Sequence, residues 1–469
     1  MAICQQTANL AGGCPIYRPC AKLIERVLDF QKSLCNLERR LASDQSHYHE
    51  TPGDNLTANS LRCRIHRGCH EIGGNCVELE ACGQRIILDL GLPLQNSSAE
   101  LPCIDGLLAE DRSLLGVFVS HPHPDHYGLL EQLTTPVPVF MGKAARRLIE
   151  TSAFFTRLPT LGDVQPQTYE DGSPLQLGPF TVTPVRIDHS AFDSYCLLVE
   201  AEGKRLFYSG DIRGHGGNAH LFQSVLDNPP PKIDVLICEG THIGRIPDFA
   251  YPDEKSVADG MLEVFQQTEG MCLVWCSSQN VDRIASVWEA CRRSGRNLIL
   301  DLYTAEILRA VDDPSLPTPG KDGVKMFLPH NQRSRIIREN AHDILDPYSK
   351  RRIYPEYLNA AAPSSVMIFR PSMLEDLKRA ECLNGASLIT SVWSGYLLRN
   401  EAELTELKRM NIERFQIHTS GHATADEIRR FVAAFPESRV VPIHSENPSG
   451  FTEMAERVEL KNDGEWWVV

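Results

Sequence analysis

The residues with the strongest chemical signal lie in one short stretch, Ser-His-Pro-His-Pro-Asp-His-Tyr-Gly at positions 120–128. Within six residues it supplies four side chains that could bind a metal ion, namely His121, His123, Asp125 and His126. Neutral imidazoles and a carboxylate are costly to crowd together without a cation, and zinc and related ions accept both as ligands. The pattern therefore predicts a metal site rather than a polar surface loop.

The flanking sequence places these ligands on a loop between a strand and a helix. An apolar run of strand length precedes them, and a run with helical spacing follows. Alternate side chains of an extended backbone face the same side, so His121 and His123 can reach one ion together. Asp125 and His126 lie past the strand end and can serve a second ion close by. Asp89 lies at the end of the preceding strand. We expect its carboxylate to support the histidines as a hydrogen-bond partner that does not itself bind the metal.

Other candidate ligands also follow predicted strands. His189, Asp211 and Glu239 each stand at the end of an apolar run, as His121 does. Three further histidines stand at strand ends near the C-terminus, at positions 418, 422 and 444. Any one of these residues alone could be an ordinary turn residue, but their repeated placement indicates a single site at one sheet edge.

A different pattern, with alternating helices and strands, occupies residues 251–385 and predicts an inserted α/β domain. In it, Ser277 and Ser278 follow a buried strand and precede a helix, whose N-terminal N–H groups could bind a phosphate. Ordinary N-cap serines are the alternative. The most basic segment of the chain, 333–352, also lies here, either as a solvated helix face or as a nucleic-acid contact.

The expected domain organisation follows from these changes of pattern. We expect an N-terminal extension with one amphipathic helix at 1–62, the first part of the metal-binding domain at 63–250, the inserted domain at 251–385 and the second part of the metal-binding domain at 386–469.

Composition limits the location and the partners of the protein. The net charge of −14 argues against a generally basic surface for nucleic acid, although metal ions can make a cleft locally positive. No stretch approaches the ~20 apolar residues of a membrane span, and the N-terminus has no secretory pattern. Several of the fifteen cysteines, including Cys196, Cys238, Cys272 and Cys276, lie in apolar strand-like runs, which favours reduced, buried thiols. We therefore expect a cytoplasmic protein without membrane contact.

The order of these motifs resembles that of the β-CASP branch of the metallo-β-lactamase superfamily. The matching motifs are His-x-His-x-Asp-His, then His189, Asp211, Glu239, Ser-Gly-His422 and Pro-Ile-His444. The segment Ile-His-Thr-Ser-Gly-His-Ala, ending at residue 423, looks closest to the ribonuclease J type, and the resemblance covers about residues 63–469. It implies an α/β fold, a metallo-β-lactamase αββα sandwich with an inserted β-CASP α/β domain.

Two departures from the ribonuclease J pattern stand near the C-terminus. The segment His-Ser-Glu-Asn-Pro-Ser-Gly at 444–450 replaces the usual His-Gly-Glu, which leaves the candidate ligand His444 in place. The chain then ends without room for the C-terminal domain of that type, so dimerisation of the ribonuclease J kind is not expected from this resemblance. An oligomer of another kind or a protein partner is left open.

The resemblance and the residue chemistry together imply two zinc ions per chain, with manganese as the alternative. One ion would be held by His121, His123 and His189. The other would be held by Asp125, His126 and His444, with Asp211 bridging the two. The implied catalytic residues are His422 as general acid, Glu239 as the residue that orients it, and Asp125. The residues implied to hold a substrate phosphate are His418, Ser420 and Gly421.

This set of residues predicts a zinc-dependent nuclease that hydrolyses phosphodiester bonds of single-stranded RNA by a two-metal mechanism, as an endoribonuclease, a 5′ exoribonuclease or both. RNA is favoured over DNA by the resemblance, and a nuclease of single-stranded DNA is the first alternative. A small-molecule hydrolase of the same superfamily would need neither the inserted domain nor the pair of His422 and Glu239. An inactive RNA-binding subunit would not need the complete set of ligands.

Overall fold

Three β-sheets form the framework of the chain in the computed structural model, which describes residues 60–96, 98–245, 249–321 and 323–469. The amphipathic helix expected in the N-terminal extension lies outside the described residues, as does nearly all of that extension, 1–62. The three sheets belong to one compact unit that begins at Asn59.

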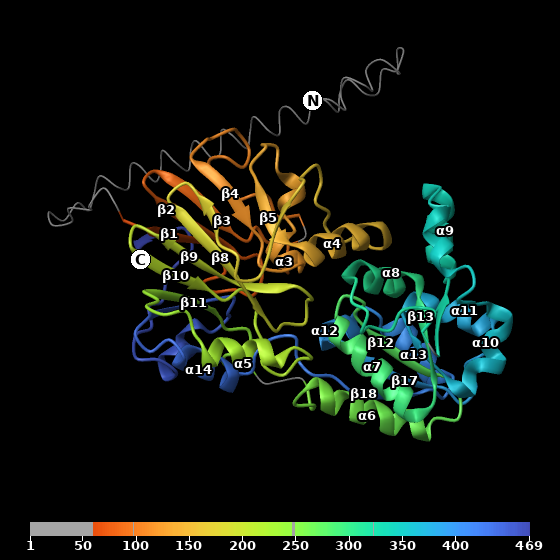
Figure 1. The fold of residues 1–469 in the computed structure, drawn as a ribbon. Coiled ribbons are helices and arrows are strands. Elements are labelled where there is room, and N and C mark those ends of the chain that lie inside the picture. The colour runs from red at the N-terminus through yellow and green to blue at the C-terminus, as the bar shows by residue number, and fades with distance from the viewer. Residues whose placement is uncertain (1–59, 97, 246–248, 322) are drawn as a thin grey trace, which may run out of the picture. The chain divides into compact units, whose positions relative to one another are not determined.

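The first sheet consists of β1 (Arg62–Arg67), β2 (Cys76–Ala81), β3 (Gln84–Leu88), β4 (Leu114–Phe118), β5 (Val139–Gly142), β6 (Gln167–Tyr169) and β20 (Trp466–Val468). Their order across the sheet is β20-β1-β2-β3-β4-β5-β6 (Figure 1). The strands from β20 to β3 pair antiparallel, and those from β3 to β6 pair parallel. The C-terminal end of β4 leads directly to the histidine-rich stretch.

The second sheet consists of β7 (Leu175–Leu177), β8 (Phe180–Ile187), β9 (Ser194–Ala201), β10 (Lys204–Tyr208), β11 (Val235–Glu239) and β19 (Arg439–Ile443). Their order is β19-β11-β10-β9-β8-β7. The strands β10, β11 and β19 are parallel, so their C-terminal ends meet at one edge. This edge brings together Asp211, Glu239 and His444, although more than two hundred residues separate the first from the last.

The two sheets pack face to face and carry helices on their outer faces. Residues such as Phe118 and Leu79 of the first sheet and Phe180 and Tyr208 of the second share the core between them. The helices on the outer faces are α3 (Pro124–Tyr127), η1 (Leu130–Gln132) and α4 (Lys143–Phe155) over the first sheet, and α5 (Ala219–Asp227) and α14 (Ala425–Ala433) over the second. Figure 1 shows α5 and α14 side by side on their sheet. The predicted αββα sandwich is confirmed.

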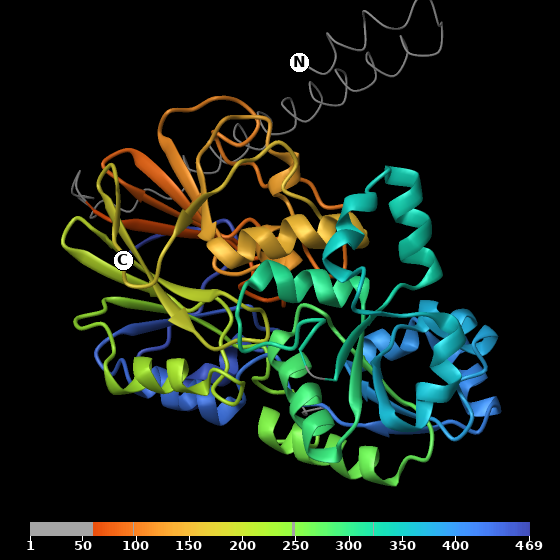
Figure 2. The same ribbon diagram turned by 45° about the vertical axis from the view of Figure 1, so that its right-hand side comes forward.

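The third sheet is entirely parallel and consists of β12 (Cys272–Cys276), β13 (Asn297–Asp301), β14 (Val324–Phe327), β15 (Arg352–Ile353), β16 (Ser365–Ile368), β17 (Ser387–Ser391) and β18 (Glu413–Gln416). Its order is β15-β14-β13-β16-β12-β17-β18. Both faces are covered, as a parallel sheet of apolar strands requires (Figure 2).

The helices around the third sheet fall into two groups. One face packs against α6 (Glu254–Gln267), α7 (Val281–Ser294) and α8 (Leu302–Val311). The other packs against α10 (Pro355–Ala361), α11 (Leu374–Arg379) and α13 (Glu401–Arg409). The shorter or peripheral helices are α9 (His330–Glu339), η2 (His342–Tyr348), η3 (Ala362–Ser364), η4 (Pro371–Met373), α12 (Ser394–Leu398) and, in the sandwich, η5 (Pro448–Glu453).

The strands β17 and β18 lie beyond residue 385, where we expected the inserted domain to end. The strand β17 pairs with β12, and β18 pairs with β17, in the third sheet. Leu388 and Ile389 of β17 belong to the cores on the two faces of this sheet, and Phe415 of β18 packs against one of these cores. We therefore propose that the inserted domain extends through β18 and that the sandwich resumes after it.

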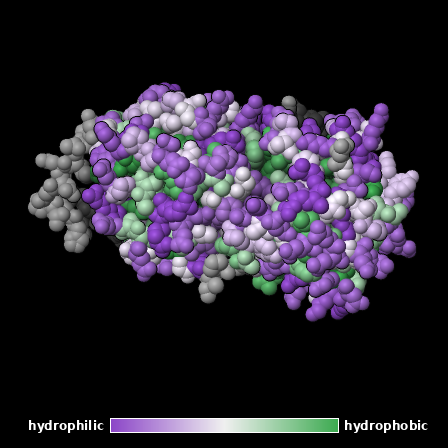
Figure 3. Space-filling model, turned by 60° about the horizontal axis from the view of Figure 1, so that its bottom comes forward, coloured by the Kyte–Doolittle hydropathy of each residue, from purple (hydrophilic) through white to green (hydrophobic). Residues whose placement is uncertain are grey.

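The surface is mixed in character. On the face drawn in Figure 3, hydrophilic side chains predominate and hydrophobic ones lie in small separate groups. Among the described helices, none combines the length and the apolar character that crossing a membrane would need. The thiols of Cys196, Cys238, Cys272 and Cys276 are free and buried, as expected.

Candidate metal centre

The histidine-rich stretch is held in place by the buried carboxylate of Asp89. This carboxylate accepts hydrogen bonds from the Ser120 backbone N–H at 2.7 Å, the Ser120 hydroxyl at 2.8 Å and the Tyr208 hydroxyl at 2.6 Å. It also lies 2.7 Å from Nδ1 of His126. Because Nδ1 of His126 is bonded to Asp89, Nε2 of the same ring faces the opposite way, toward Asp211. The expected support by Asp89 is present.

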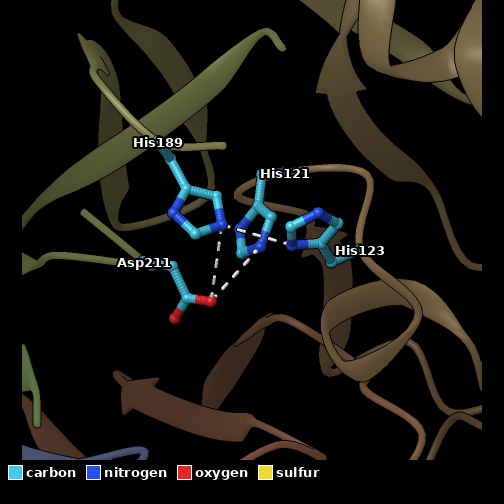
Figure 4. Close-up of side chains that lie close together, drawn as sticks. All are labelled: His121, His123, His189 and Asp211. Atoms are coloured by element: carbon cyan, nitrogen blue, oxygen red, sulfur yellow. Dashed lines mark hydrogen bonds and ion pairs between the residues drawn. The ribbon is translucent and has the colours of Figure 1, made fainter. Parts of the chain in front are cut away.

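The first group of potential ligands contains His121, His123, His189 and Asp211 (Figure 4). One ligand atom from each lies within 4.8 Å of all the others. Oδ2 of Asp211 is 3.5 Å from Nε2 of His121 and 3.8 Å from Nε2 of His189. Nε2 of His189 is in turn 3.2 Å from Nδ1 of His123. The two histidines of the loop therefore meet a histidine and a carboxylate from the second sheet.

The second group contains Asp125, His126, His444 and again Asp211. Nε2 of His126 is 3.2 Å from Oδ2 of Asp211, and Nε2 of His444 is 3.8 Å from Oδ2 of Asp125. Nδ1 of His444 lies 2.9 Å from Oδ1 of Asn75, which fixes the ring. Asp211 thus belongs to both groups, as a bridging carboxylate would.

Several buried polar atoms of these two groups have no hydrogen-bond partner among the described residues. They are Nε2 of His121, Nε2 of His126, Nδ1 of His189, both carboxylate oxygens of Asp211 and Nε2 of His444. A buried polar atom without a partner costs about 1–3 kcal/mol, so a cluster of six would be strongly destabilising. A cation with imidazole and carboxylate ligands removes that cost, and the residues therefore fit a metal cofactor.

The protonation states of most of the histidines suit metal binding. Burial lowers the pKa of His121, His189 and His444 well below the ordinary value, and it lowers that of His123 to about 4. These rings are neutral at pH 7, which is the form that binds a metal. His126 differs, because the neighbouring carboxylates of Asp211 and Asp89 outweigh its burial and raise its pKa.

A third group, beside the other two, consists of His422, Glu239 and Asp211. Nδ1 of His422 is 3.3 Å from each carboxylate oxygen of Glu239. The Thr241 hydroxyl donates to Glu239 at 2.6 Å, and the Ile212 N–H donates at 2.8 Å. Burial lowers the pKa of His422, but the carboxylates of Glu239 and Asp211 outweigh it and raise that pKa to about 9. The imidazole is therefore protonated at neutral pH and can give up a proton.

The loop that carries His422 contains the residues predicted to hold a phosphate. The Ser420 hydroxyl accepts from the His422 N–H at 3.0 Å and lies 2.6 Å from Nε2 of His242. Gly421 packs so closely on Ser190 that any side chain at this position would clash with the Ser190 hydroxyl. His418 lies on the other side of the loop, where its Nδ1 accepts from Nη1 of Arg283 at 3.0 Å.

The two serines predicted at a phosphate-binding helix start have other partners. Ser278 is buried, and its hydroxyl bonds to the Thr304 hydroxyl at 2.6 Å and to the Arg370 guanidinium. The Ser277 hydroxyl accepts from the Gln279 N–H at 3.2 Å. The helix α7 is capped by Asn280 instead. Among the described residues, no hydrogen bond joins either serine to the metal groups or to the 418–422 loop, and their phosphate role stays a prediction.

Sequence analysis did not single out several residues that shape the site. Asn75, Thr241 and Arg213 each contact a candidate ligand, the candidate acid or the loop that carries it. Thr241 and Arg213 each follow an acidic residue of the site by two positions, a spacing that could have drawn attention to them. Nothing in the sequence near Arg283 indicated its contact with the loop.

Two protein families match separate parts of the chain. The family described as "Beta-lactamase superfamily domain" matches residues 84–245, and the family described as "Zn-dependent metallo-hydrolase RNA specificity domain" matches residues 408–464. The first match contains the loop ligands, His189, Asp211 and Glu239, and the second contains His422 and His444.

Similar proteins of known name include two bacterial ribonucleases J. That of Sinorhizobium meliloti is 23% identical over 388 residues, which cover 77% of this chain and 64% of the relative. That of Mycoplasma genitalium is 22% identical over 417 residues, which cover 84% of this chain and 69% of the relative. The chain thus spans about two thirds of the length of these two proteins.

A solved structure shares the fold. It is the crystal structure of a protein of unknown function from Enterococcus faecalis V583, with a TM-score of 0.71 at 20% sequence identity. The match covers 87% of this chain and 100% of that chain, so it includes the sandwich and the third sheet together.

Proposed function

Because the chain is a ribonuclease J-like member of the β-CASP branch of the metallo-β-lactamase superfamily, we propose that it is a metal-dependent nuclease of single-stranded RNA. The observation that carries this proposal is the arrangement of the three groups around Asp211. Two of them are suited to a cation, and the third holds a protonated histidine beside both. A generic metal-dependent hydrolase would need only the first two.

The metal content of the proposal is two zinc ions, with manganese as the alternative. The first ion would be held by His121, His123, His189 and Asp211, and the second by Asp125, His126, His444 and Asp211. When bound, paired divalent ions lower the pKa of water and stabilise the charge that develops on phosphate oxygens during an in-line displacement.

In this proposal, His422 acts as the general acid. A protonated imidazole can donate its proton to the leaving 3′-oxygen when the P–O bond breaks. Glu239 accepts from Nδ1 of His422 and holds the ring so that Nε2 is the atom that donates. Ser420 and Gly421, directly before His422, would hold the phosphate in place, with His418 contributing from the same loop. Asp125 completes the set of catalytic residues through its carboxylate in the second group.

The substrate part of the proposal rests on the relatives. Two bacterial proteins named ribonuclease J align with most of this chain, and the match at 408–464 carries an RNA specificity description. Cleavage could proceed from the 5′ end, internally or in both ways. Single-stranded DNA is the second candidate substrate, because its phosphodiester bond presents the same leaving 3′-oxygen.

End-labelled single-stranded RNA and DNA of the same sequence test this proposal. Each is incubated with the wild type, His123→Ala and His422→Ala in the presence of zinc or manganese. We expect cleavage of RNA by the wild type, loss of cleavage in His123→Ala, and a rate about 10²–10⁴-fold lower in His422→Ala, the usual worth of a general acid. The lengths of the products separate endonuclease from exonuclease action.

The possible outcomes are distinct. Failure of the metal-loaded wild type to cleave either polymer would overturn the nuclease proposal and leave the small-molecule hydrolase or the RNA-binding subunit. Cleavage that survives in His123→Ala would overturn the metal assignment. Faster cleavage of DNA than of RNA would replace the substrate and keep the mechanism.

A further inference from the structure

A second buried polar cluster lies next to the metal centre and is built from charged side chains. The carboxylate of Glu254, the first residue of α6, accepts from Nη2 of Arg283 at 2.8 Å and from Nε of Arg283 at 2.9 Å. Its Oε1 also lies 3.4 Å from Nη1 of Arg213. Both arginines are 0% exposed and Glu254 is 5% exposed. We call Arg213, Glu254 and Arg283 the buried ionic network.

The network joins the two parts of the fold. Glu254 and Arg283 belong to α6 and α7, which cover the third sheet, whereas Arg213 follows β10 of the sandwich. Nη2 of Arg213 also makes a 2.5 Å contact with Oδ2 of Asp282 in α7. Desolvating so many charges costs several kcal/mol per ion unless each is paired with good geometry. The described contacts of this network tie α6 and α7 to the segment that follows β10.

The same arginines hold the backbone that leads to His422. Nη2 of Arg283 donates to the Thr419 carbonyl at 3.2 Å, and Nη1 of Arg213 donates to the Ser420 carbonyl at 3.4 Å. A further donor, Nε2 of His215, lies 3.1 Å from the same Ser420 carbonyl. Three donors therefore converge on two consecutive carbonyls, two and three residues before the candidate general acid.

Arg213 also reaches the strand ends that carry metal ligands. Its backbone N–H donates to the Asp188 carbonyl at 2.7 Å, and its Nε lies 3.3 Å from Oδ1 of Asp188, the residue before His189. Gly216 lies against the guanidinium so closely that any side chain there would clash with it. Arg213 is itself two residues after Asp211. The Arg213 side chain is thus confined to one position. There it contacts the loop before His422 and the segment before His189, and it belongs to the segment that carries Asp211.

We propose that Arg213, Glu254 and Arg283 are positioning residues that set the place of the 419–422 backbone, and through it the place of His422 relative to the metal centre. This proposal rests on the proposed function for its catalytic readout. Glu254 holds the Arg283 guanidinium by two hydrogen bonds and contacts that of Arg213, which Asp188 and Asp282 also hold, and the two guanidinium groups donate to the two carbonyls. When the Thr419 and Ser420 carbonyls are held, the His422 ring is restricted to one orientation relative to Glu239 and to the substrate. A shift of about 1 Å in a reacting group can cost 10²-fold in rate.

The chain offers a matched control for this network. Glu78 in β2 is also 0% exposed and also lies between two arginines, with Nη2 of Arg64 at 2.8 Å and Nη1 of Arg85 at 2.7 Å. None of these three residues contacts the 419–422 backbone by a described hydrogen bond. Glu78→Gln removes the same buried charge as Glu254→Gln, so it reports the general cost to stability alone.

The test compares Glu254→Gln, Arg283→Lys and Glu78→Gln in the full chain loaded with zinc. The measurements are kcat and KM on single-stranded RNA, the unfolding temperature, and hydrogen–deuterium exchange of peptides that contain residues 418–423. We expect kcat to fall about 10–100-fold in Glu254→Gln and Arg283→Lys, with KM changed less than about 3-fold. Exchange in 418–423 should rise in these two variants while the strands of the sheets stay protected. Glu78→Gln should lower the unfolding temperature and leave kcat and the exchange of 418–423 unchanged.

Several outcomes would overturn the proposal. They are an unchanged kcat and unchanged exchange in Glu254→Gln, or a fall in kcat that Glu78→Gln reproduces. If Glu254→Gln and Arg283→Lys do not fold, Ser391→Ala replaces them, because Nη1 of Arg283 donates to the Ser391 hydroxyl at 2.5 Å. The exchange measurement needs no turnover. An inactive wild type would therefore refute the proposed function, while a rise in exchange would still support the positioning role.

Discussion

Two buried polar clusters lie side by side in this protein, and they differ in whether their atoms have partners. In the metal centre, six buried nitrogen and oxygen atoms of His121, His126, His189, Asp211 and His444 have no hydrogen-bond partner among the described residues. In the buried ionic network, the polar atoms of Arg213, Glu254 and Arg283 are paired within the protein, and none of them is left without a partner. Burial of polar groups alone therefore does not mark a binding site. A cluster of unpaired buried atoms indicates a site suited to a ligand, whereas paired atoms indicate a structural or positioning role.

The two clusters also differ in the charge of their side chains, and this supports the same distinction between a binding site and a positioning network. Burial keeps most histidines of the metal centre neutral, so they offer lone pairs to a cation. In the network, burial acts against the charge of Glu254, but Arg283 and Arg213 outweigh it and lower the pKa of that carboxyl to about 2. The network carries its charges permanently, while the metal centre needs a cation from outside the chain.

The two clusters should differ most in how their stability responds to metal. Removal of metal with a chelator should lower the stability of the wild type by about 4 kcal/mol for each of the two proposed ions, if zinc is otherwise present at 1,000 times the dissociation constant of each site. Calorimetric unfolding with and without added zinc measures the change. Glu254→Gln should keep the response to zinc, because its site has no part in binding the ion, whereas His123→Ala should lose much of it. A wild-type unfolding temperature that does not depend on zinc would contradict the assignment of the unpaired atoms to a cation.

The next effect concerns pH and the two buried glutamates. Burial raises the pKa of both glutamates, but their hydrogen-bonded partners outweigh it and lower both folded-state values to about 2, below the ordinary 4.5. These partners are Arg283 and Arg213 at Glu254, and His66 followed by Arg64 at Glu78. A lowered folded-state pKa contributes stability above the ordinary value and loses it as the pH falls. Each carboxylate should therefore contribute about 3 kcal/mol near neutral pH, which disappears between about pH 5 and pH 2.

Urea unfolding at a series of pH values measures this contribution. The wild type should be more stable than Glu254→Gln and Glu78→Gln at pH 6, and the difference should shrink as the pH falls toward 2, where the protonated carboxyl resembles the amide. A difference that is constant over this range would show that the charge of the carboxylate is not the source of the stability.

The smallest effect concerns the helix that follows the loop. Thr424 caps α14, and its hydroxyl accepts from the Glu427 N–H at 3.2 Å. Thr424→Ala should cost about 1 kcal/mol of stability, the usual worth of an N-cap. Because the arginines and His215 hold the preceding carbonyls, kcat on RNA should change less than about 2-fold. A large loss of kcat would show that the loop depends on the helix cap as much as on the network.

The sequence was informative about this protein where chemistry and local structure coincide. The strand-end positions of His121, His189, Asp211, Glu239 and His444 could be read from apolar runs and turn residues, because strand periodicity is a local property. The αββα sandwich followed from the resemblance that these motifs carried. The serines at 277 and 278 show the limit of local reasoning, since a serine before a helix has the same sequence signal whether its hydroxyl faces a ligand or, as at Ser278, bonds to Thr304 and Arg370.

The side chains that could bind a metal, and their order along the chain, can thus be predicted from the sequence. The folded structure was needed to show that Asp211 belongs to three groups at once, that β17 and β18 extend the third sheet, and that Arg213 and Arg283 donate to the backbone before His422. The physical reason is the separation along the chain. Arg213 and Ser420 are 207 residues apart, and no local pattern records a contact that forms only when the sandwich and the third sheet pack together.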